Sequence, residues 1–183
     1  GVVGSTRYHD DTGAATFFTG SIQELIHFSD APVNNARRII IDNHLSSKYD
    51  VDLVSNQFYN TVHSTLYFNE VAGIGQFNGS ESHTNSQGTS ILRISNPTSL
   101  DLGDYLIWGH DSVKFTPPAA PVTWTAPPSI HNALHRVWRA SELGGDIGSV
   151  DLRFDLSNWT VASPSDLYLM VDSDDGDFFN ATL

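Results

Sequence analysis

The chain contains no cysteine, which excludes both a disulfide framework and a zinc site built on thiolates. Cationic residues are also scarce: nine Lys plus Arg stand against 21 Asp plus Glu, which gives a formal net charge of -12. Binding to nucleic acid needs clustered cations that release counterions from phosphates, so we expect no nucleic-acid partner. The same deficit argues against docking on anionic lipid.

Long apolar runs are missing as well. No stretch approaches the roughly 20 apolar residues that a helix needs to cross a bilayer, so we expect no membrane insertion. The length of 183 residues suits one large domain, or one domain with part of another. Few lysines, no cysteine and abundant Asn, Ser, Thr and Gly favour an exported bacterial protein, secreted or on the cell surface, over an acidic cytosolic domain.

One segment, residues 31–49, has a clear helical pattern. Asp30 can cap its first turn, Pro32 is tolerated within that turn, and Lys48 suits the negative end of the helix dipole. Asp50 can take the left-handed conformation that ends many helices. Two opposite sides of this helix are apolar: Ala36, Ile39 and Ile40 form one, and Ile41, Leu45 and Tyr49 form the other. We therefore expect the helix to pack between β layers.

Most other segments show the short apolar alternation of strands. The pattern predicts strands within residues 1–9, 14–19, 21–28, 64–77, 88–96, 105–108, 134–140, 148–156 and 166–171. Gly73 and Gly75 predict a bulge or a close backbone contact, and the polar stretch 78–87 predicts a loop. Many short strands with one helix indicate a mainly β fold, a β-sandwich of jelly-roll-like type.

Several sequence blocks resemble a junction found in large secreted bacterial surface proteins. The blocks are the helix with its flanks (residues 21–53), EVAGIGQ (70–76), GDYLIWGHD (103–111), HRVWRASELGGDIGSVDLRFDL (135–156) and LYLMVDSDDGDF (167–178). In that family a laminin-G or concanavalin-like lectin domain precedes an uncharacterised β-rich domain that begins with such a helix. Asp50 stands where the family usually has Gly.

The resemblance implies an organisation and a context. Residues 1–30 would hold strands that complete a preceding lectin-like sheet, and residues 31–183 would form the helix and the β-sandwich domain. The implied context is adhesion or polysaccharide use by a multi-domain surface protein, and no catalytic residue is implied.

An acidic loop near the end of the chain is a candidate Ca²⁺ site. Its four carboxylates belong to Asp172, Asp174, Asp175 and Asp177. Ca²⁺ prefers such oxygen ligands, and Gly176 allows the chain to wrap tightly. The spacing is not that of an EF-hand, because the glycine comes one position early and no Glu closes the loop. A solvated loop without metal is the alternative, since each like-charge pair costs only about 0.7 kcal/mol at ~6 Å in water.

A proline-rich excursion over residues 109–131 presents Trp124, a candidate platform for stacking on a sugar ring. Tyr59, His63, His83 and Asn85 lie on polar segments and are candidates to line the same ligand-binding surface. The alternatives are a Trp124 that folds over the core and ordinary solvated loop residues. Trp108 and Trp138 fall within strand patterns, where we expect core positions.

No catalytic motif is present. His110, Asp111 and Ser112 are adjacent, which directs successive side chains of a strand to opposite faces and argues against a triad. We expect His110 and Asp111 to tie a strand end to Arg136 or Arg139 instead. Glycoside hydrolysis needs only two suitably spaced carboxylates, so a polysaccharide hydrolase stays a third interpretation.

The leading expectation is a non-catalytic extracellular module that binds polysaccharide or cell-surface glycan, or that mediates adhesion. The second, from another class, is a structural module that spaces or polymerises a surface protein. An open sheet edge near the start of the chain would pair with neighbouring copies or domains of the same protein.

Overall fold

The computed structural model describes residues 20–29, 33–59, 66–88, 91–113, 120–121, 132–133, 136–157, 167–173 and 178. By its internal contacts the chain divides into two compact units, Gly1–Val33 and Asn34–Leu183. In the first unit, residues 20–29 form neither helix nor strand. The predicted strand over residues 21–28 is therefore wrong: its apolar alternation is present, but no described strand pairs with its backbone. The predicted strands in residues 1–9 and 14–19 lie outside the described residues.

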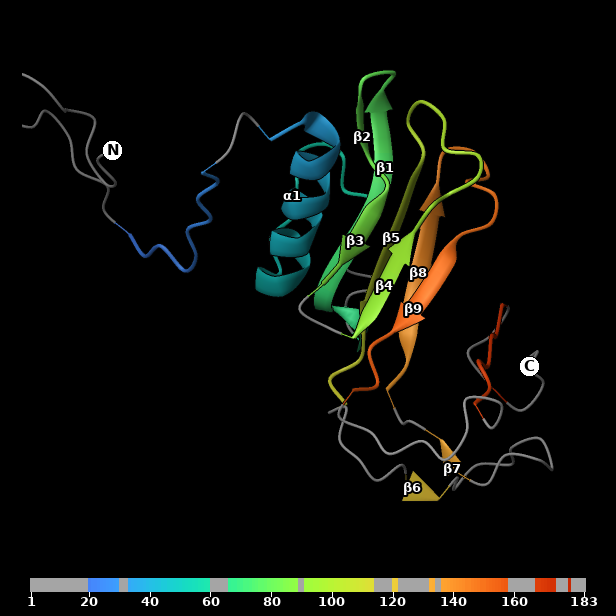
Figure 1. Ribbon diagram of the computed structural model, residues 1–183. Helices are drawn as coiled ribbons and strands as arrows, with labels where there is room; N and C mark the ends of the chain where they lie inside the picture. Colours follow the sequence, from blue (N-terminus) through green and yellow to red (C-terminus); the bar gives the residue numbers. More distant parts are fainter. Residues whose placement is uncertain are drawn as a thin grey trace, which may run out of the picture. The chain divides into compact units, whose positions relative to one another are not determined.

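The second unit is a mainly β fold with two antiparallel sheets and one helix, as predicted (Figure 1). The four-stranded sheet has the order β2 (Glu81–His83), β1 (Asn69–Asn78), β5 (Tyr105–His110) and β8 (Trp138–Leu143). The three-stranded sheet has the order β3 (Asn85–Gln87), β4 (Leu92–Ser95) and β9 (Asp151–Phe154). The short strands β6 (Ala120–Pro121) and β7 (Asn132–Ala133) pair separately. Together the two larger sheets make a β-sandwich.

The polar stretch 78–87 contains two strands rather than one loop. Asn78 holds the turn between β1 and β2, because its Oδ1 accepts hydrogen bonds from the amides of Ser80 and Glu81. After Thr84 the chain leaves the four-stranded sheet and enters the other one as β3. Both are edge strands with polar side chains, so the apolar alternation that reveals a strand is absent. Likewise, residues 167–170 form no strand, contrary to the prediction.

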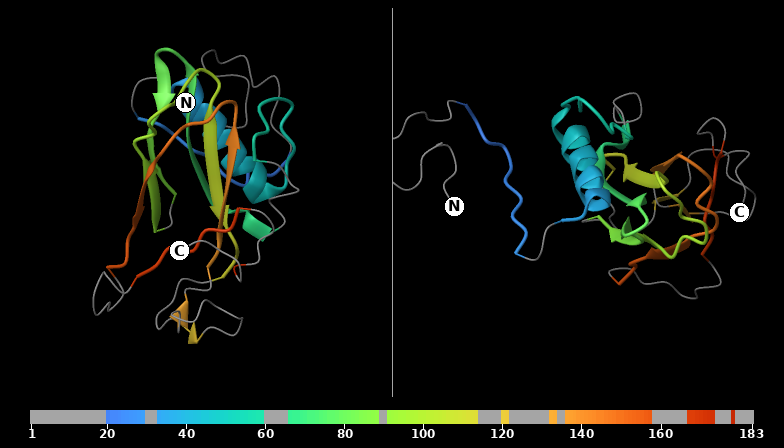
Figure 2. Two further views of the ribbon diagram at one scale, coloured as in Figure 1. Left: turned by 90° about the vertical axis from the view of Figure 1, so that its right-hand side faces the viewer. Right: turned by 90° about the horizontal axis from the view of Figure 1, so that it is seen from above.

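Two hydrophobic clusters lie on opposite faces of the four-stranded sheet. Ala72, Ile74 and Trp108 pack with residues of the three-stranded sheet, and Trp138 packs against this cluster. On the other face, Val71 of β1 and Tyr105 and Ile107 of β5 pack with Ile39 and Ile40 of the helix. The four-stranded sheet is therefore the middle layer of the unit (Figure 2). The predicted core position of Trp108 is confirmed, whereas Trp138 is only partly buried.

Helix α1 (Asn35–Tyr49) covers the outer face of this middle sheet, where it contacts β1 and β2. It begins four residues later than predicted, and Asn34 caps it by accepting a 2.9 Å hydrogen bond from the amide of Arg37. Asp50 ends it in the left-handed conformation, with φ of 52°, as predicted. The expected position between β layers is met on one side only. On its second apolar side Ile41 lines a groove described below. The connecting loop, residues 51–59, is hydrogen-bonded to Asn43 of the helix.

Glycines allow close packing around the four-stranded sheet. Gly73 faces the helix, because a Cβ added there would lie 3.2 Å from Cγ1 of Ile40. A Cβ added to Gly75 would lie 2.1 Å from the ring of Tyr105, and one added to Gly109 would lie 2.2 Å from the carbonyl oxygen of Tyr67. Both contacts are shorter than any side chain tolerates. The predicted close contact at Gly75 is therefore confirmed, and its partner is an aromatic ring in the core.

A single buried amide joins the helix to the loop at residues 51–59. Asn43 is fully buried, and its Nδ2 donates to the carbonyl oxygens of Ile39 and Asn56, both at 2.8 Å. Its Oδ1 accepts from the backbone amides of Phe58 at 2.7 Å and Tyr59 at 2.8 Å. Both N–H donors and both acceptor lone pairs of this side-chain amide are thus paired, as burial requires.

We expect the substitution Asn43→Ala to lower the free energy of unfolding by about 2–4 kcal/mol, because two buried backbone amides lose their acceptor. Urea unfolding followed by tryptophan fluorescence measures this change. Asn85→Ala, the same change at an exposed position of β3, is the control and should stay within about 0.5 kcal/mol of the unmodified protein. A loss below about 1 kcal/mol for Asn43→Ala would contradict this account.

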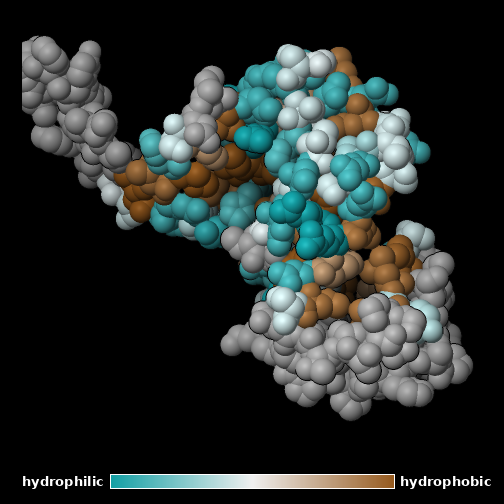
Figure 3. Space-filling view, viewed as in Figure 1, coloured by the Kyte–Doolittle hydropathy of each residue, from teal (hydrophilic) through white to brown (hydrophobic). Residues whose placement is uncertain are grey.

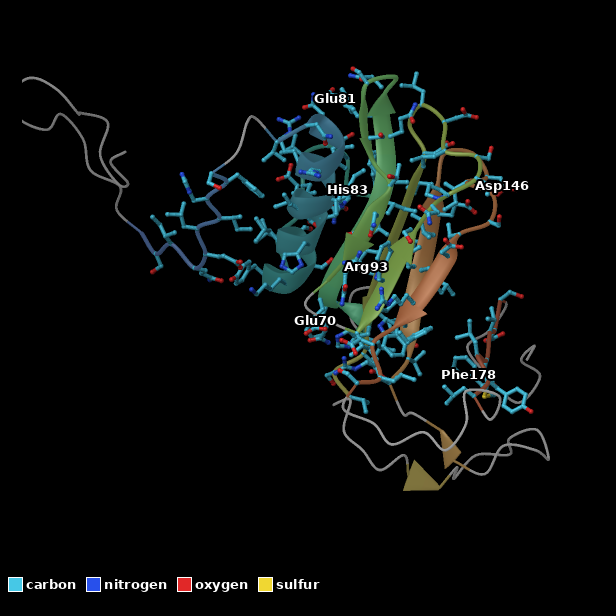
Figure 4. All side chains as sticks on the ribbon, viewed as in Figure 1. Glu70, Glu81, His83, Arg93, Asp146 and Phe178 are labelled. Carbon is cyan, nitrogen blue, oxygen red and sulfur yellow. The ribbon has the colours of Figure 1, made fainter. Side chains whose placement is uncertain are left out.

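The start of α1 is tied to the β1–β2 hairpin through Glu81 (Figure 4). Its carboxylate accepts hydrogen bonds from the side chain and the backbone amide of Asn35, and from the side chain of Asn78 at 2.6 Å. The side-chain bond from Asn35, followed by the backbone bond, lowers the pKa of Glu81 below its usual 4.5.

A carboxylate with a lowered pKa in the folded state stabilises the fold above its unfolded pKa and loses that effect as the pH falls through the folded pKa. We therefore expect Glu81→Gln to lower the melting temperature at pH 7, and the difference from the unmodified protein to shrink below pH 4.5. Calorimetry from pH 3 to pH 7 measures both effects, and Asp42→Asn on the same helix controls for loss of one charge. A difference that stays constant over this range would argue against the capping role.

Candidate functional site

A groove of about 200 Å³ opens between α1 and the strands β1, β2 and β3. Its apolar lining consists of Ile40, Ile41, Val71 and Ala72. Arg37, His44 and His83 contribute a guanidinium and two imidazoles, and residues 86–88, which include the amide of Gln87, close the remaining side. Figure 4 shows His83 between α1 and β1. The groove thus combines an apolar floor with a basic rim.

Helical spacing places the basic rim over the groove. Arg37, Ile41 and His44 are separated by four and three residues, so they lie on one face of α1. The ring of His44 is fixed by a 3.0 Å hydrogen bond between its Nδ1 and the carbonyl oxygen of Val71. Because a carbonyl oxygen only accepts, Nδ1 carries the proton, and Nε2 is the acceptor of the neutral ring.

A β-bulge in β1 makes this carbonyl available. Pairing with β5 skips from Asn69 to Ala72, and Glu70 has a φ of 51°, a left-handed conformation that is rare for residues with a side chain. Gly88 packs directly against the backbone of the bulge, since a Cβ added to it would lie 2.6 Å from the carbonyl oxygen of Glu70. The wall of the groove therefore depends on glycine at this position.

Arg37 and His83 face one another across the groove. Nε of Arg37 donates to Nδ1 of His83 at 3.3 Å, and a guanidinium has no lone pair with which to accept. Nδ1 of His83 is therefore unprotonated, and the neutral ring carries its proton on Nε2. Burial, followed by the charge of Arg37, lowers the pKa of His83 below its usual 6.5.

A second polar cluster lies where β1 begins and β5 ends, on the other side of the bulge. Nε2 of His110 is 2.9 Å from Oε2 of Glu70, and Nη1 of Arg136 is 3.9 Å from the same oxygen. Arg136 also donates through Nε to the carbonyl oxygen of Val113. The expected tie between this strand end and Arg136 exists, but Glu70 mediates it. The carboxylate of Asp111 accepts from the amide of Val113, so no triad forms.

The candidate ligand-binding residues do not form one surface. His83 lines the groove, and Asn85 is exposed on β3 just before the residues that close it. Tyr59 is 1% exposed, and its hydroxyl donates to the carbonyl oxygen of Tyr67 at 2.9 Å, so its predicted role in ligand binding is wrong. Burial raises the pKa of Tyr59, as expected in the core. His63 and Trp124 lie outside the described residues.

Arg37 and His44 were not among the residues predicted from the sequence to bind a ligand, whereas His83 was. Their signal is present in the sequence: two nitrogen-bearing side chains on one helix face, in a chain with only nine Lys plus Arg. What the sequence alone does not supply is the facing strand that turns this helix face into one wall of a groove.

The proposed Ca²⁺ loop is only partly described. Asp172 is half-buried, whereas Asp174, Asp175 and Asp177 lie outside the described residues. Within the part of the chain that the structure describes, no group of three or more His, Asp or Glu side chains could hold a metal ion. Ca²⁺ binding by this loop stays a prediction.

None of the described helices has the length and apolar character that crossing a membrane requires. A family model described as a domain of unknown function (DUF8202) matches residues 41–183. The match begins within α1 and includes His44, His83 and all strands of the sandwich, while Arg37 and Ile40 precede it. No curated protein and no solved structure matches the chain.

A histidine whose pKa is lowered on folding disfavours the folded state at acidic pH, because the unfolded chain binds its proton more readily. We expect the melting temperature of the unmodified protein to fall more steeply between pH 7.5 and pH 5 than that of His83→Gln. Scanning calorimetry measures the two slopes. His27→Gln replaces an exposed histidine in the same way and serves as the control. Parallel curves for the unmodified protein and His83→Gln would contradict the buried, Arg37-paired environment.

Proposed function

This chain belongs to the DUF8202 family, and we propose that it acts as a non-catalytic carbohydrate-binding module whose site is the groove between α1 and β1. The observation that carries the proposal is an apolar floor with hydrogen-bonding side chains on one rim. A sugar ring has an apolar face and a polar edge, so this lining complements it. Few, convergent polar groups over an apolar floor are typical of small-molecule sites.

The size of the groove suits a single sugar residue. Its volume of about 200 Å³ is below the roughly 300–1,000 Å³ of pockets that hold drug-sized ligands. One terminal or branching sugar would therefore sit in the groove while the rest of a glycan extends into solvent. Recognition of one residue at a time is compatible with adhesion, where weak sites act together on a repetitive surface.

The chemistry of the lining supports binding rather than hydrolysis. Glycosidases typically place two carboxyl groups about 5–9.5 Å apart around the scissile bond. Among the described residues that line the groove there is no Asp or Glu. Glu70, whose side chain is 32% exposed, pairs with His110 in the cluster that holds strand ends together.

The cellular context is part of the proposal. An exported bacterial surface protein is favoured by the composition of the chain and by its resemblance to domains that follow laminin-G or concanavalin-like lectins. In such a protein the module would attach the larger chain to polysaccharide or to a cell-surface glycan.

One observation favours assembly as a second candidate function. Residues 20–29 expose the apolar side chains of Ile22, Leu25, Ile26 and Phe28, each between 39% and 68% (Figure 3). An extended apolar segment of this kind is suited to pairing with a sheet edge of a neighbouring copy or domain.

A glycan array followed by titration calorimetry tests the leading proposal. We expect Ile41→Ala to weaken binding of a glycan hit about fivefold, because about 1 kcal/mol of apolar contact with the sugar is lost. Leu45→Ala, one turn further along α1 and outside the groove, is the matched control and should leave binding unchanged. No hit on the array, together with oligomers that grow with protein concentration in light scattering, would favour assembly instead.

A further inference from the structure

The groove contains one cationic side chain, Arg37, and two imidazoles, in a chain whose formal net charge is -12. Among the described lining residues, no carboxylate balances the guanidinium of Arg37. Resting on the glycan-binding function proposed above, we propose that the groove selects an acidic sugar, a hexuronate residue, whose carboxylate is held by Arg37. The ligand would thus supply the negative charge that the lining lacks.

Arg37 is arranged to receive a carboxylate. Its Nε is used by His83, and no described residue accepts from its two terminal nitrogens. The side chain is exposed, so these nitrogens are accessible at the rim. A guanidinium presents paired N–H groups in a plane, which matches the two oxygens of a carboxylate. Because Nε is fixed by His83, the orientation of the fork is set before the ligand arrives.

The two imidazoles recognise the atoms beside that carboxylate. The proton of neutral His83 is on Nε2, which makes this atom a donor to a carboxylate or ring oxygen. His44 is the reverse: its Nδ1 donates to Val71, so its Nε2 accepts from a hydroxyl group. A carboxylate flanked by hydroxyl groups offers both partners at once, and this is the pattern of a sugar acid. A neutral hexose lacks the group that would compensate the charge of Arg37.

The net charge of the whole chain restricts the class of acidic glycan that can bind. A net charge of -12 repels a polyanion over distances up to the Debye length, about 8 Å at physiological salt. A compact single carboxylate at the rim meets Arg37 at hydrogen-bond distance, where attraction dominates. We therefore expect isolated uronate residues in a mostly neutral glycan to be preferred over densely charged polymers.

Calorimetry with matched short oligosaccharides tests the inference. The probes share one backbone and end in glucuronate, its methyl ester or glucose, and a sulfated glucose is the fourth probe. We expect the glucuronate probe to bind at least about tenfold more tightly than the ester and the glucose probe, since a charge-assisted bidentate pair is worth more than 1.4 kcal/mol. Arg37→Gln should abolish the preference, whereas Arg38→Gln, the adjacent exposed cation outside the groove, should retain it.

The outcomes separate this inference from the proposed function. Equal binding of all four probes, reduced by Ile41→Ala, would retain glycan binding and overturn the acidic preference. Binding of the sulfated probe alone, lost in Arg37→Gln, would overturn the carboxylate assignment. If no probe binds and the array is also negative, both proposals fail. Melting curves of each variant establish that the fold is intact.

Discussion

The buried side chain of Asn43 is the interaction on which the outer half of the molecule depends. Its Nδ2 donates to a carbonyl oxygen inside α1 and to one in the loop that follows the helix. Its Oδ1 accepts hydrogen bonds from the backbone amides of Phe58 and Tyr59. This link supplements the packing of Phe58 and Tyr59 over the sheet, because the backbone of residues 51–59 pairs with no described strand. Without this link the aromatic rings of Phe58 and Tyr59 would be held in the cluster that supports the helix by packing alone.

The consequence reaches the groove. The helix is held at its start by Glu81, in its middle by Asn43 and on its groove side by His44, so its rotation about its own axis is fixed. That rotation decides which side chains face β3. Gly73 leaves room for Ile40 of the helix, and His44 bonds to the backbone of β1 at Val71. A site of modest size is thus set by packing on three sides before any ligand binds.

Features with a strong local signal that tertiary contacts support could be predicted from the sequence, and features set by distant contacts could not. The buried strand β5, the left-handed Asp50 and the core position of Trp108 follow from local signals that tertiary contacts reinforce. The edge strands β2 and β3 carry no apolar alternation, and their pairing comes from neighbours distant in sequence. Tyr59 looked like an exposed loop aromatic because the buried Asn43 that satisfies its backbone lies 16 residues earlier. The predicted strand at residues 21–28 has the pattern of a strand without a described partner.

Glu70, at the bulge in β1, contributes both to the wall of the groove and to the cluster at the strand ends. Its backbone forms part of the contact with Gly88 at the groove, while its carboxylate bonds His110 in the cluster that joins the strand ends. Loss of ligand binding after replacement of Glu70 would therefore have two possible causes, since the substitution changes the backbone of the bulge and breaks the ion pair with His110. In a mutational survey of this family, an acidic residue at such a bulge would give the same loss of function as a catalytic carboxylate, although its role is structural.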